Sequence, residues 1–476
     1  MIALYLFIAL CCSALAFGVK QRWASVLAVL AFLSTQLGLN YYAWGHLSQT
    51  DSIYFSFDAL GFIFTSVLSI ISLPVFYNSY RMLEHQTGEW ADKRKASLYT
   101  AALIILIAVL TAVYFADNYG ILWVLIEVST IALAALIYFY RTKLALEATW
   151  KYIFLSSVGI SLVLISLLFL NVAMHRESGA SLHISAVLEN AKNLDPLWLK
   201  VAFALMVTGL STKMGVFPFH TVGIDATMVA PHPVNVLMST ALKNAGFVAV
   251  FRLYQAVMQT SIAEWASHVL LLVGLISIAL AATQTQRTQN LNRMLGYSGL
   301  EHVGLALVGL SLGQVGFYAA VFHLVLHSFA KAGLFLQMGQ VNRIYDHHFP
   351  EKNAAYFHSN PIGSLVVLLG YIGVMALPPS GLFSTELMIF SQLAAQKQWW
   401  VLVLVLFLMT IVLLTLGRQV MNMLYGIKAK IKTDVAVVKV DALEIIAQIT
   451  VLGLMIYIGF NPPVFLVDLL NQACVR

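Results

Sequence analysis

The chain has 476 residues, of which 60% are hydrophobic and only 10% are charged. Soluble globular proteins are about half apolar and about a quarter charged, so this composition excludes a soluble globule and predicts a polytopic membrane protein. The net charge of +6 does not indicate nucleic-acid binding, because it reflects how basic residues are distributed between the two sides of a membrane.

Apolar stretches recur along the whole chain. A spanning helix needs about 20 apolar residues, and on that criterion we predict an all-α membrane protein with about 14 transmembrane helices. The predicted spans cover about residues 2–17, 22–43, 56–79, 97–115, 118–139, 149–173, 198–217, 228–257, 264–282, 294–312, 315–339, 361–395, 400–425 and 440–467. We expect a single membrane domain over residues 1–476, with a core at 97–425 and flanking helices at 1–80 and 440–476.

The basic residues predict an orientation for these spans. Lys and Arg collect in the cytoplasmic loops of membrane proteins. Of the 27 Lys and Arg residues, 18 lie in the odd-numbered loops or near the span ends that border them. With an even number of spans, both termini are then expected on the non-cytoplasmic side.

Two runs of five spans, at about 97–257 and 264–425, share one feature. In each run the fourth span is interrupted by proline, at Pro218 in the first and at Pro378-Pro379 in the second. Proline deletes a backbone donor and breaks a helix. Because five is an odd number, the two runs are expected to be inverted repeats, as in transporters whose broken helices meet a polar site near the membrane midplane. The alternative is a pair of unrelated proline kinks.

Ionisable residues stand near the middle of five of these apolar stretches. A charge at the centre of a spanning helix costs roughly 2.5–3.5 kcal/mol, so this set predicts a polar pathway through the helix bundle. Its members are Glu127, Lys213, Lys243, the triplet His323, His327 and Lys331, and Glu386.

The first group joins Glu127 and Lys213, with His220, Asp225 and His232 in the connection that follows. A buried lysine beside a glutamate can accept and release a proton if the carboxylate moves or is protonated. The alternative interpretation is a static buried ion pair.

The second group is spaced for a single helix face. His323, His327 and Lys331 are four residues apart, which separates them by about 6 Å of helical rise per step, so single waters can bridge them. Ordinary core histidines are the alternative. A zinc site is not expected, because no carboxylate accompanies the two histidines in sequence and Lys331 opposes a cation. Glu301 and His302 are either a second carboxylate–imidazole station or a helix-end pair.

No cofactor is predicted for this chain. Three cysteines cannot supply the four thiolates of an iron–sulfur cluster, and no glycine-rich nucleotide loop follows a strand. Any redox chemistry is therefore expected in partner proteins.

Taken together, these segments resemble the antiporter-like membrane subunits of respiratory complex I, Mrp antiporters and group 4 hydrogenases, and most closely the F subunit of hydrogenase-4-type enzymes. The likeness covers about residues 97–425. Its pieces, in family order, are residues 123–127, 213–220 with Asp225 and 230–234, 242–246, 293–298 with Glu301 and His302, the His323/His327/Lys331 helix, and 377–386.

The resemblance implies a role for each station. Glu127 and Lys213 would form the charge pair of a first half-channel, with Lys243 as the connecting lysine. Glu386 would be the terminal carrier of a second half-channel, reached through the triplet helix.

Two positions depart from the family pattern. The family often has lysine where this chain has Glu386. It also usually has a Lys-Arg pair before the segment at 294–298, where this chain has Asn292 and Arg293. No long lateral helix is predicted after the last span, which favours a medial or hydrogenase-type subunit.

The resemblance therefore predicts a proton-translocating subunit of a membrane-bound redox complex, either formate hydrogenlyase-like or complex I-like. Expected partners are other membrane subunits, the lipid bilayer, and a peripheral hydrogenase or quinone-reductase arm with Ni–Fe or Fe–S centres. We expect the complex in a bacterial or archaeal cytoplasmic membrane. The alternatives are an Mrp-type Na⁺/H⁺ antiporter subunit and a non-pumping scaffold for a catalytic arm.

Overall fold

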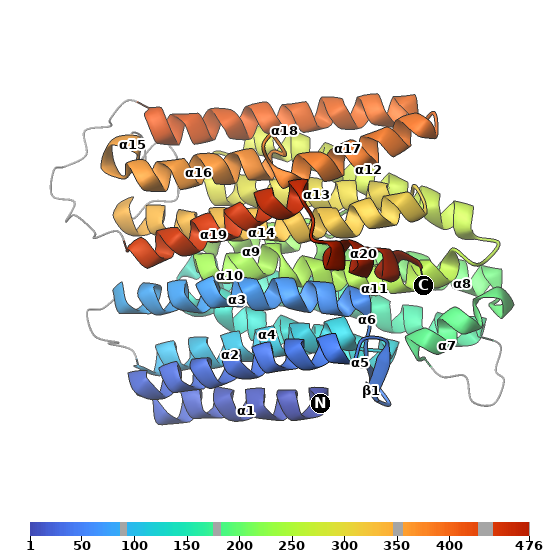
Figure 1. The fold of residues 1–476 in the computed structure, drawn as a ribbon, viewed down its shortest axis with the longest axis horizontal. Coiled ribbons are helices and arrows are strands. Elements are labelled where there is room, and N and C mark those ends of the chain that lie inside the picture. The colour runs from blue at the N-terminus through green and yellow to red at the C-terminus, as the bar shows by residue number, and fades with distance from the viewer. Residues whose placement is uncertain (86–92, 175–181, 346–355, 427–440, 476) are drawn as a thin grey trace. The chain divides into compact units, whose positions relative to one another are not determined.

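The computed structural model describes residues 1–85, 93–174, 182–345, 356–426 and 441–475. Within these ranges the chain is almost entirely helical, and 12 helices are long and apolar enough to cross a membrane (Figure 1). The predicted all-α, multi-pass membrane fold is therefore confirmed. The described residues divide into two compact units, and the division falls at residue 270 inside one helix, close to the predicted boundary between the two runs of spans.

Unit 1 comprises residues 1–230, 241–270 and 468–476. Its elements are α1 (Ile2–Val19), α2 (Arg22–Gly45), β1 (Gln49–Ser52), β2 (Phe55–Phe57), α3 (Ala59–His85), α4 (Lys93–Phe115), α5 (Tyr119–Ile137), η1 (Tyr138–Tyr140), α6 (Lys143–Ala173), α7 (Ile184–Glu189), η2 (Ala191–Asn193), α8 (Pro196–Met214), α9 (Thr221–Val229), α11 (Ala241–Val257) and the start of α12. The two strands form a short antiparallel hairpin between α2 and α3.

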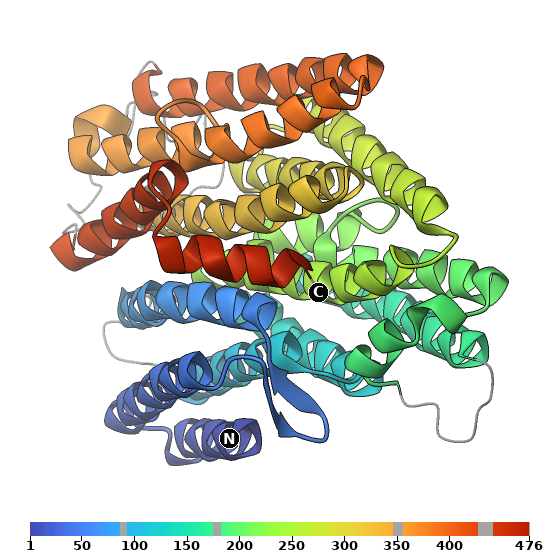
Figure 2. The same cartoon turned by 45° about the vertical axis from the view of Figure 1, so that its right-hand side comes forward.

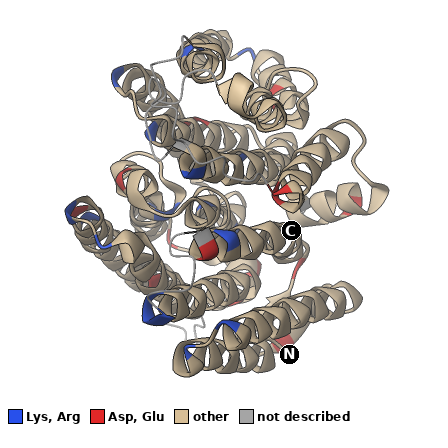
Figure 3. Cartoon of the chain, turned by 90° about the vertical axis from the view of Figure 1, so that its left-hand side faces the viewer, with Lys and Arg blue, Asp and Glu red and all other residues tan. Residues whose placement is uncertain are grey.

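Unit 2 comprises residues 231–240 and 271–467. Its elements are α10 (His232–Ser239), most of α12 (Ala263–Arg287), α13 (Leu291–Leu310), α14 (Gln314–Tyr345), α15 (Tyr356–Ser359), α16 (Pro361–Val374), α17 (Gly381–Ala395), α18 (Trp399–Tyr425), α19 (Ala442–Phe460) and the start of α20 (Val464–Val475), whose remainder from Asp468 belongs to unit 1. Figure 2 shows these helices from a second side, and Figure 3 shows Lys and Arg at several helix ends on the left-hand side of Figure 1.

Two of the fourteen predicted spans are not among the 12 long apolar helices. The predicted span at 294–312 forms the 20-residue helix α13, and the one at 361–395 is divided into α16 and α17. The predicted span at 440–467 also ends early, at Phe460, and the shorter α20 follows.

The first predicted break is present in α8. This helix ends at Met214, and Gly215 adopts a left-handed conformation with φ of 69°, which a glycine accepts without strain. The helix resumes as α9 at Thr221, after Pro218. The break therefore lies a few residues before the proline, where the backbone can turn.

The second predicted break separates α16 from α17. Ser380 caps the new helix, since its Oγ accepts a hydrogen bond from the backbone N–H of Leu382 at 3.1 Å. The same hydroxyl lies 3.1 Å from the carbonyl oxygen of Gly373 and can donate to it. One serine therefore serves both the end of α16 and the start of α17.

A third interruption, at Thr240, was not predicted. It separates α10 from α11 inside the predicted span at 228–257, and the nearest proline, Pro233, lies at the start of α10 rather than at the interruption. The Thr240 hydroxyl donates to the carbonyl of Val236 at 2.7 Å, and that of Ser239 donates to Asn235 at 2.7 Å. Hydroxyls that bond back to the preceding turn favour bending of a helix.

Glycines allow neighbouring helices to approach closely in each unit. A Cβ at Gly209 of α8 would lie 2.4 Å from the carbonyl oxygen of Gly159 of α6 in unit 1. A Cβ at Gly274 of α12 would lie 2.6 Å from the carbonyl oxygen of Gly304 of α13 in unit 2. Such contacts provide the backbone packing that holds membrane helices together.

A buried ion pair fixes α11 within unit 1. Arg252, which is 4% exposed, donates from Nη2 to both carboxylate oxygens of Asp58 at 2.9 Å. It also donates to the carbonyls of Tyr114 and Ala116, at the C-terminal end of α4. Asp58 in turn accepts a hydrogen bond from the N–H of Gly61 at the start of α3. One arginine thus ties α11 to the ends of α3 and α4.

Candidate functional site

The first group of predicted residues meets around Thr130 in unit 1. Lys213, near the end of α8, is 2% exposed, and its Nζ donates a hydrogen bond to Thr130 Oγ1 on α5. The Thr130 hydroxyl lies 3.4 Å from Oε2 of Glu127, one turn earlier on α5, and can donate to it. The structure therefore places a hydroxyl between Glu127 and Lys213, where the sequence predicted a direct charge pair. Nζ of Lys213 also lies 5.6 Å from the ring centre of Tyr152, within cation–π range.

Lys243 lies against the break in α8. A Cβ built at Gly215 would lie 3.4 Å from Cε and 3.6 Å from Nζ of Lys243, so the ammonium group is next to the C-terminal end of α8. The partial negative charge of that helix end favours a cation there. Gly246, one turn further along α11, allows the close approach, because a Cβ there would lie 3.0 Å from the backbone nitrogen of Met214.

The three predicted auxiliary residues of the connection lie on different elements. His220 precedes α9, with its Nδ1 3.3 Å from the carbonyl oxygen of Pro218, and Asp225 is a partly buried residue of α9. His232 begins α10 and belongs to unit 2. Its Nε2 accepts a hydrogen bond from Nδ2 of Asn342 on α14 at 2.6 Å. His232 is thereby assigned to the neighbourhood of α14.

The predicted triplet is fully buried in unit 2. His323, His327 and Lys331 lie on α14 and are each 0% exposed. Nζ of Lys331 donates to Ser298 Oγ at 2.5 Å and to the carbonyl of Leu295 at 2.8 Å, both on α13. Buried charges persist when such hydrogen bonds accompany them.

His302, which the sequence marked only as an auxiliary residue, lies at the centre of this group. It is on α13 and is 1% exposed, and its ring centre lies 5.2 Å from that of His323 and 4.9 Å from that of His327. Its Nε2 lies 2.5 Å from the carbonyl oxygen of Val374, the last residue of α16. A carbonyl only accepts hydrogen bonds, so we assign a proton to Nε2 of His302.

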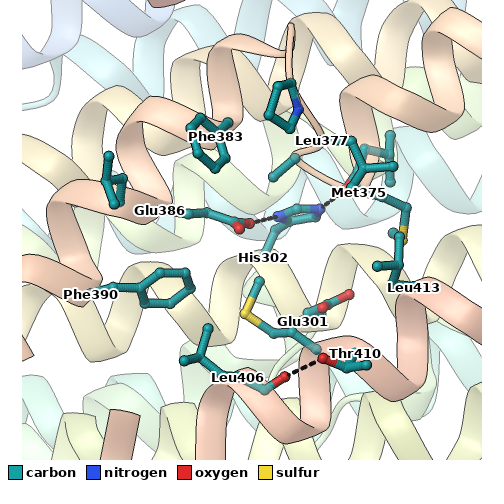
Figure 4. Close-up of a pocket in the computed structure, with 15 residues that line it drawn as sticks. Glu301, His302, Met375, Leu377, Phe383, Glu386, Phe390, Leu406, Thr410 and Leu413 are labelled. Carbon is teal, nitrogen blue, oxygen red and sulfur yellow. Dashed lines mark hydrogen bonds and ion pairs between the residues drawn. The ribbon is translucent and has the colours of Figure 1, made fainter. Parts of the chain in front are cut away.

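The other ring nitrogen of His302 faces two groups that can exchange a proton with it. Nδ1 lies 3.1 Å from Nε2 of His323 and 3.9 Å from Oε1 of Glu386 on α17 (Figure 4). Nδ1 of His323 is in turn 2.9 Å from the hydroxyl of Thr385. Because Nε2 of His302 is held by Val374, any proton that His302 gains or loses moves at Nδ1. The two sides of the second helix break therefore meet at one imidazole.

Two buried carboxylates line the cavity beside this imidazole. Glu386 is 6% exposed and Glu301 is 2% exposed, and both line a cavity of about 200 Å³ together with His302. Within the part of the chain that the structure describes, Oε1 of Glu386 and Oε2 of Glu301 have no hydrogen-bond partner. Buried polar atoms of this kind are usually satisfied by water, and the cavity has room for it.

The fold brings a carboxylate to one of the two histidines of α14 that have none near them in the sequence. A ligand atom from each of His302, His323 and Glu386 lies within 4.8 Å of the others. The residues are 84 positions apart at the extremes, so their spacing in the sequence gave no sign of this. Thr130 was also missed, although its position three residues after Glu127 is the spacing of neighbours on one helix face.

The comparisons identify the family. The model of the NADH:quinone oxidoreductase/Mrp antiporter transmembrane family matches residues 116–413. The chain belongs to this family. Within the family it is an antiporter-like subunit, and it is 26% identical over 350 residues to a hydrogenase-4 component F homolog of Methylacidiphilum infernorum, which covers 72% of this chain and 73% of the relative. The resemblance inferred from the sequence is therefore confirmed.

Solved structures show the same antiporter-like fold. A chain of the archaeal membrane-bound sulfane sulfur reductase, a respiratory membrane complex, matches with a TM-score of 0.86 at 22% identity, covering 99% of this chain and 96% of the other. A chain of the Mrp complex from Dietzia sp. DQ12-45-1b matches with a TM-score of 0.84 at 15% identity and the same coverage. At sequence identities this low, the two matches show that the fold is shared and nothing more.

Proposed function

We propose that this protein is a proton-translocating subunit of a membrane-bound redox complex. The observation that carries the proposal is the pairing of a broken helix with buried ionisable groups in each unit. Lys213 and Lys243 stand at the end of α8, and the imidazole of His302 stands at the end of α16. Ionisable residues buried in spanning helices mark ion pathways, because they are costly to keep otherwise.

In unit 1, the proposed step moves a proton between Glu127 and Lys213. Thr130 lies between them, accepts from Lys213 and reaches Glu127 with its own proton. Lys243, at the same helix end as Lys213, is the proposed next acceptor. A lysine that exchanges its proton in this way changes its charge next to a helix end that favours the charged form.

In unit 2, the proposed step hands a proton from His323 to Glu386 at a single nitrogen. Nδ1 of His302 receives the proton from Nε2 of His323 and passes it to Oε1 of Glu386. Lys331 and His327, which lie further along α14, are the proposed earlier stations of the path. Glu301 lines the same cavity as Glu386. Glu386 is the proposed terminal carrier, since it borders the cavity.

The proposed partners are other membrane subunits and a peripheral arm that carries the redox centres. The matched relatives and structures include a hydrogenase-4 component and a respiratory membrane complex, which supports a redox-driven assembly. The chain has three cysteines, so iron–sulfur chemistry is assigned to those partners. We propose a bacterial or archaeal cytoplasmic membrane as its location, with both termini on the non-cytoplasmic side.

A pumping measurement tests this proposal. Lys213→Ala is expected to leave the abundance of the complex nearly unchanged and to abolish most of the proton uptake by inverted membrane vesicles. Normal uptake by an assembled Lys213→Ala complex would refute the assignment. Co-purification of nickel–iron or iron–sulfur subunits supports the redox complex, whereas Na⁺/H⁺ exchange without them favours the Mrp-type alternative. Assembly with an active arm but no uptake in the unaltered protein would identify a scaffold.

A further inference from the structure

Three ligand atoms of unit 2 converge on one point beside the cavity. Nδ1 of His302 lies 3.1 Å from Nε2 of His323 and 3.9 Å from Oε1 of Glu386, and the three residues offer ligand atoms within 4.8 Å of one another. Zinc binds nitrogen and oxygen ligands at about 2.0–2.2 Å in tetrahedral sites, which separates the ligand atoms by roughly 3.3–3.5 Å. The separations of 3.1 and 3.9 Å lie on either side of that range, and the third pair of ligand atoms lies within 4.8 Å.

We propose that His302, His323 and Glu386 form a binding site for a divalent cation of the Zn²⁺ class, taken up from solution and inhibitory when bound. Two imidazole nitrogens and one carboxylate oxygen are a common set of three protein ligands for zinc, with a water in the fourth position. The cavity of about 200 Å³ next to Glu386 has room for that water. This is a site for an exogenous ion rather than for a resident cofactor.

The surroundings of the two histidines support the site independently. Histidines that bind a metal usually donate their other ring N–H to a carbonyl, carboxylate or hydroxyl, which fixes the ring. Nε2 of His302 donates to the carbonyl of Val374, and Nδ1 of His323 lies 2.9 Å from the hydroxyl of Thr385. Both imidazoles are thus held with the remaining nitrogen directed at the common point.

The charges near the point also favour a cation. Glu386 brings one carboxylate to the site, and Glu301 lines the same cavity with a second (Figure 4). Lys331, which opposes a cation, is eight residues beyond His323 on α14 and therefore about 12 Å further along the helix. Glu386 Oε1 has no hydrogen-bond partner among the described residues, so a cation would satisfy a buried oxygen.

Inhibition follows from competition for the same atoms, and this part rests on the proposed function. A cation on Nδ1 of His302 and Oε1 of Glu386 occupies the donor and the acceptor of the proposed proton step. Zinc binding itself does not depend on pumping. The two parts can therefore be measured separately.

Zinc binding is tested on the purified whole complex after chelator treatment. We expect the unaltered complex to bind one Zn²⁺ per copy of this chain that the Glu386→Gln complex does not bind, as measured by equilibrium dialysis. Zinc bound by other subunits is the same in both complexes and cancels in the difference. Thr385→Val, which removes only the partner of His323, is expected to weaken binding by about 10- to 100-fold. His327→Gln is the matched control for binding, because His327 is a buried neighbour outside the ligand set and its loss should leave the stoichiometry unchanged.

X-ray absorption at the zinc edge gives the second readout. We expect a shell of nitrogen and oxygen ligands with two imidazoles. The site is overturned if Glu386→Gln keeps the same stoichiometry and affinity as the unaltered complex, or if the shell contains sulfur. Stoichiometric binding that leaves proton uptake unaffected would overturn the inhibitory role and the proposed path through His302. Loss of uptake on binding supports both.

Discussion

Replacement of Thr130 by valine tests the link between Glu127 and Lys213 directly. Valine keeps the shape of threonine and removes the hydroxyl that accepts from Nζ of Lys213 and reaches Glu127 at 3.4 Å. A hydrogen bond to a charged group contributes about 1.5–3 kcal/mol. If that free energy is lost from the proton-transfer step, its rate falls by about 10- to 150-fold.

The assay compares proton uptake by inverted vesicles with the amount of assembled complex. Thr130→Ser, which keeps the hydroxyl, is expected to pump at close to the normal rate. Ser129→Ala is the matched control, because Ser129 is a fully buried hydroxyl on the same helix that donates to the carbonyl of Ile126 at 2.6 Å and takes no part in the link. Normal uptake by assembled Thr130→Val would show that the proton does not pass through this hydroxyl.

Three further substitutions make separate predictions. Glutamine cannot ionise, so Glu386→Gln should reduce proton uptake almost as much as Glu386→Ala, whereas Glu386→Lys should restore part of the uptake. If Glu386 had only a packing role, Glu386→Gln would leave uptake nearly normal and Glu386→Lys would abolish it. Gly459→Ala should lower the abundance of the complex, because its Cβ would lie 2.0 Å from Cα of Gly381, whereas Gly453→Ala on the same helix meets nothing within 4 Å and should be tolerated. Arg252→Met leaves Asp58 buried without its partner and should cost about 3–5 kcal/mol of stability, seen as loss of folded protein on mild heating.

The membrane fold and its two proline breaks were predictable because each depends on local sequence. The length of an apolar stretch shows whether it can span the membrane, and proline removes a backbone donor wherever it occurs. Pro218 and Pro378 therefore predicted helix interruptions without information on the residues packed around them. The interruption at Thr240 escaped because hydroxyls that bond back to the preceding turn are common in membrane helices, and most do not divide them.

The arrangement of the site was less predictable because it depends on contacts between distant segments. His302 became the centre of unit 2 through Val374, 72 residues later in the chain, and through His323, 21 residues later. Neither spacing has a period that a helix or strand would reveal. The sequence identified ionisable residues inside the helices, of which Lys213 and Glu386 are buried while Glu127 and Lys243 are half-buried. It paired Glu127 with Lys213 and omitted Thr130, since threonine in a spanning helix rarely marks a site.

The two proposed steps impose different demands on the side chain in the middle. A hydroxyl carries one proton, so Thr130 must pass its own proton on and then rotate back before it can act again. The nearby carbonyl of Ile126, at 3.2 Å, can accept a hydrogen bond from the hydroxyl between transfers.

An imidazole usually accepts a proton at one nitrogen and releases a proton from the other. His302 is prevented from doing so because Val374 holds Nε2, and His323 and Glu386 both face Nδ1. The proton must therefore arrive and leave at the same atom, which requires the ring or Glu386 to shift between the two contacts of 3.1 and 3.9 Å. The longer contact is the one to Glu386, on the helix that starts after the break, so movement of α17 relative to α16 is the motion that would open and close the exit.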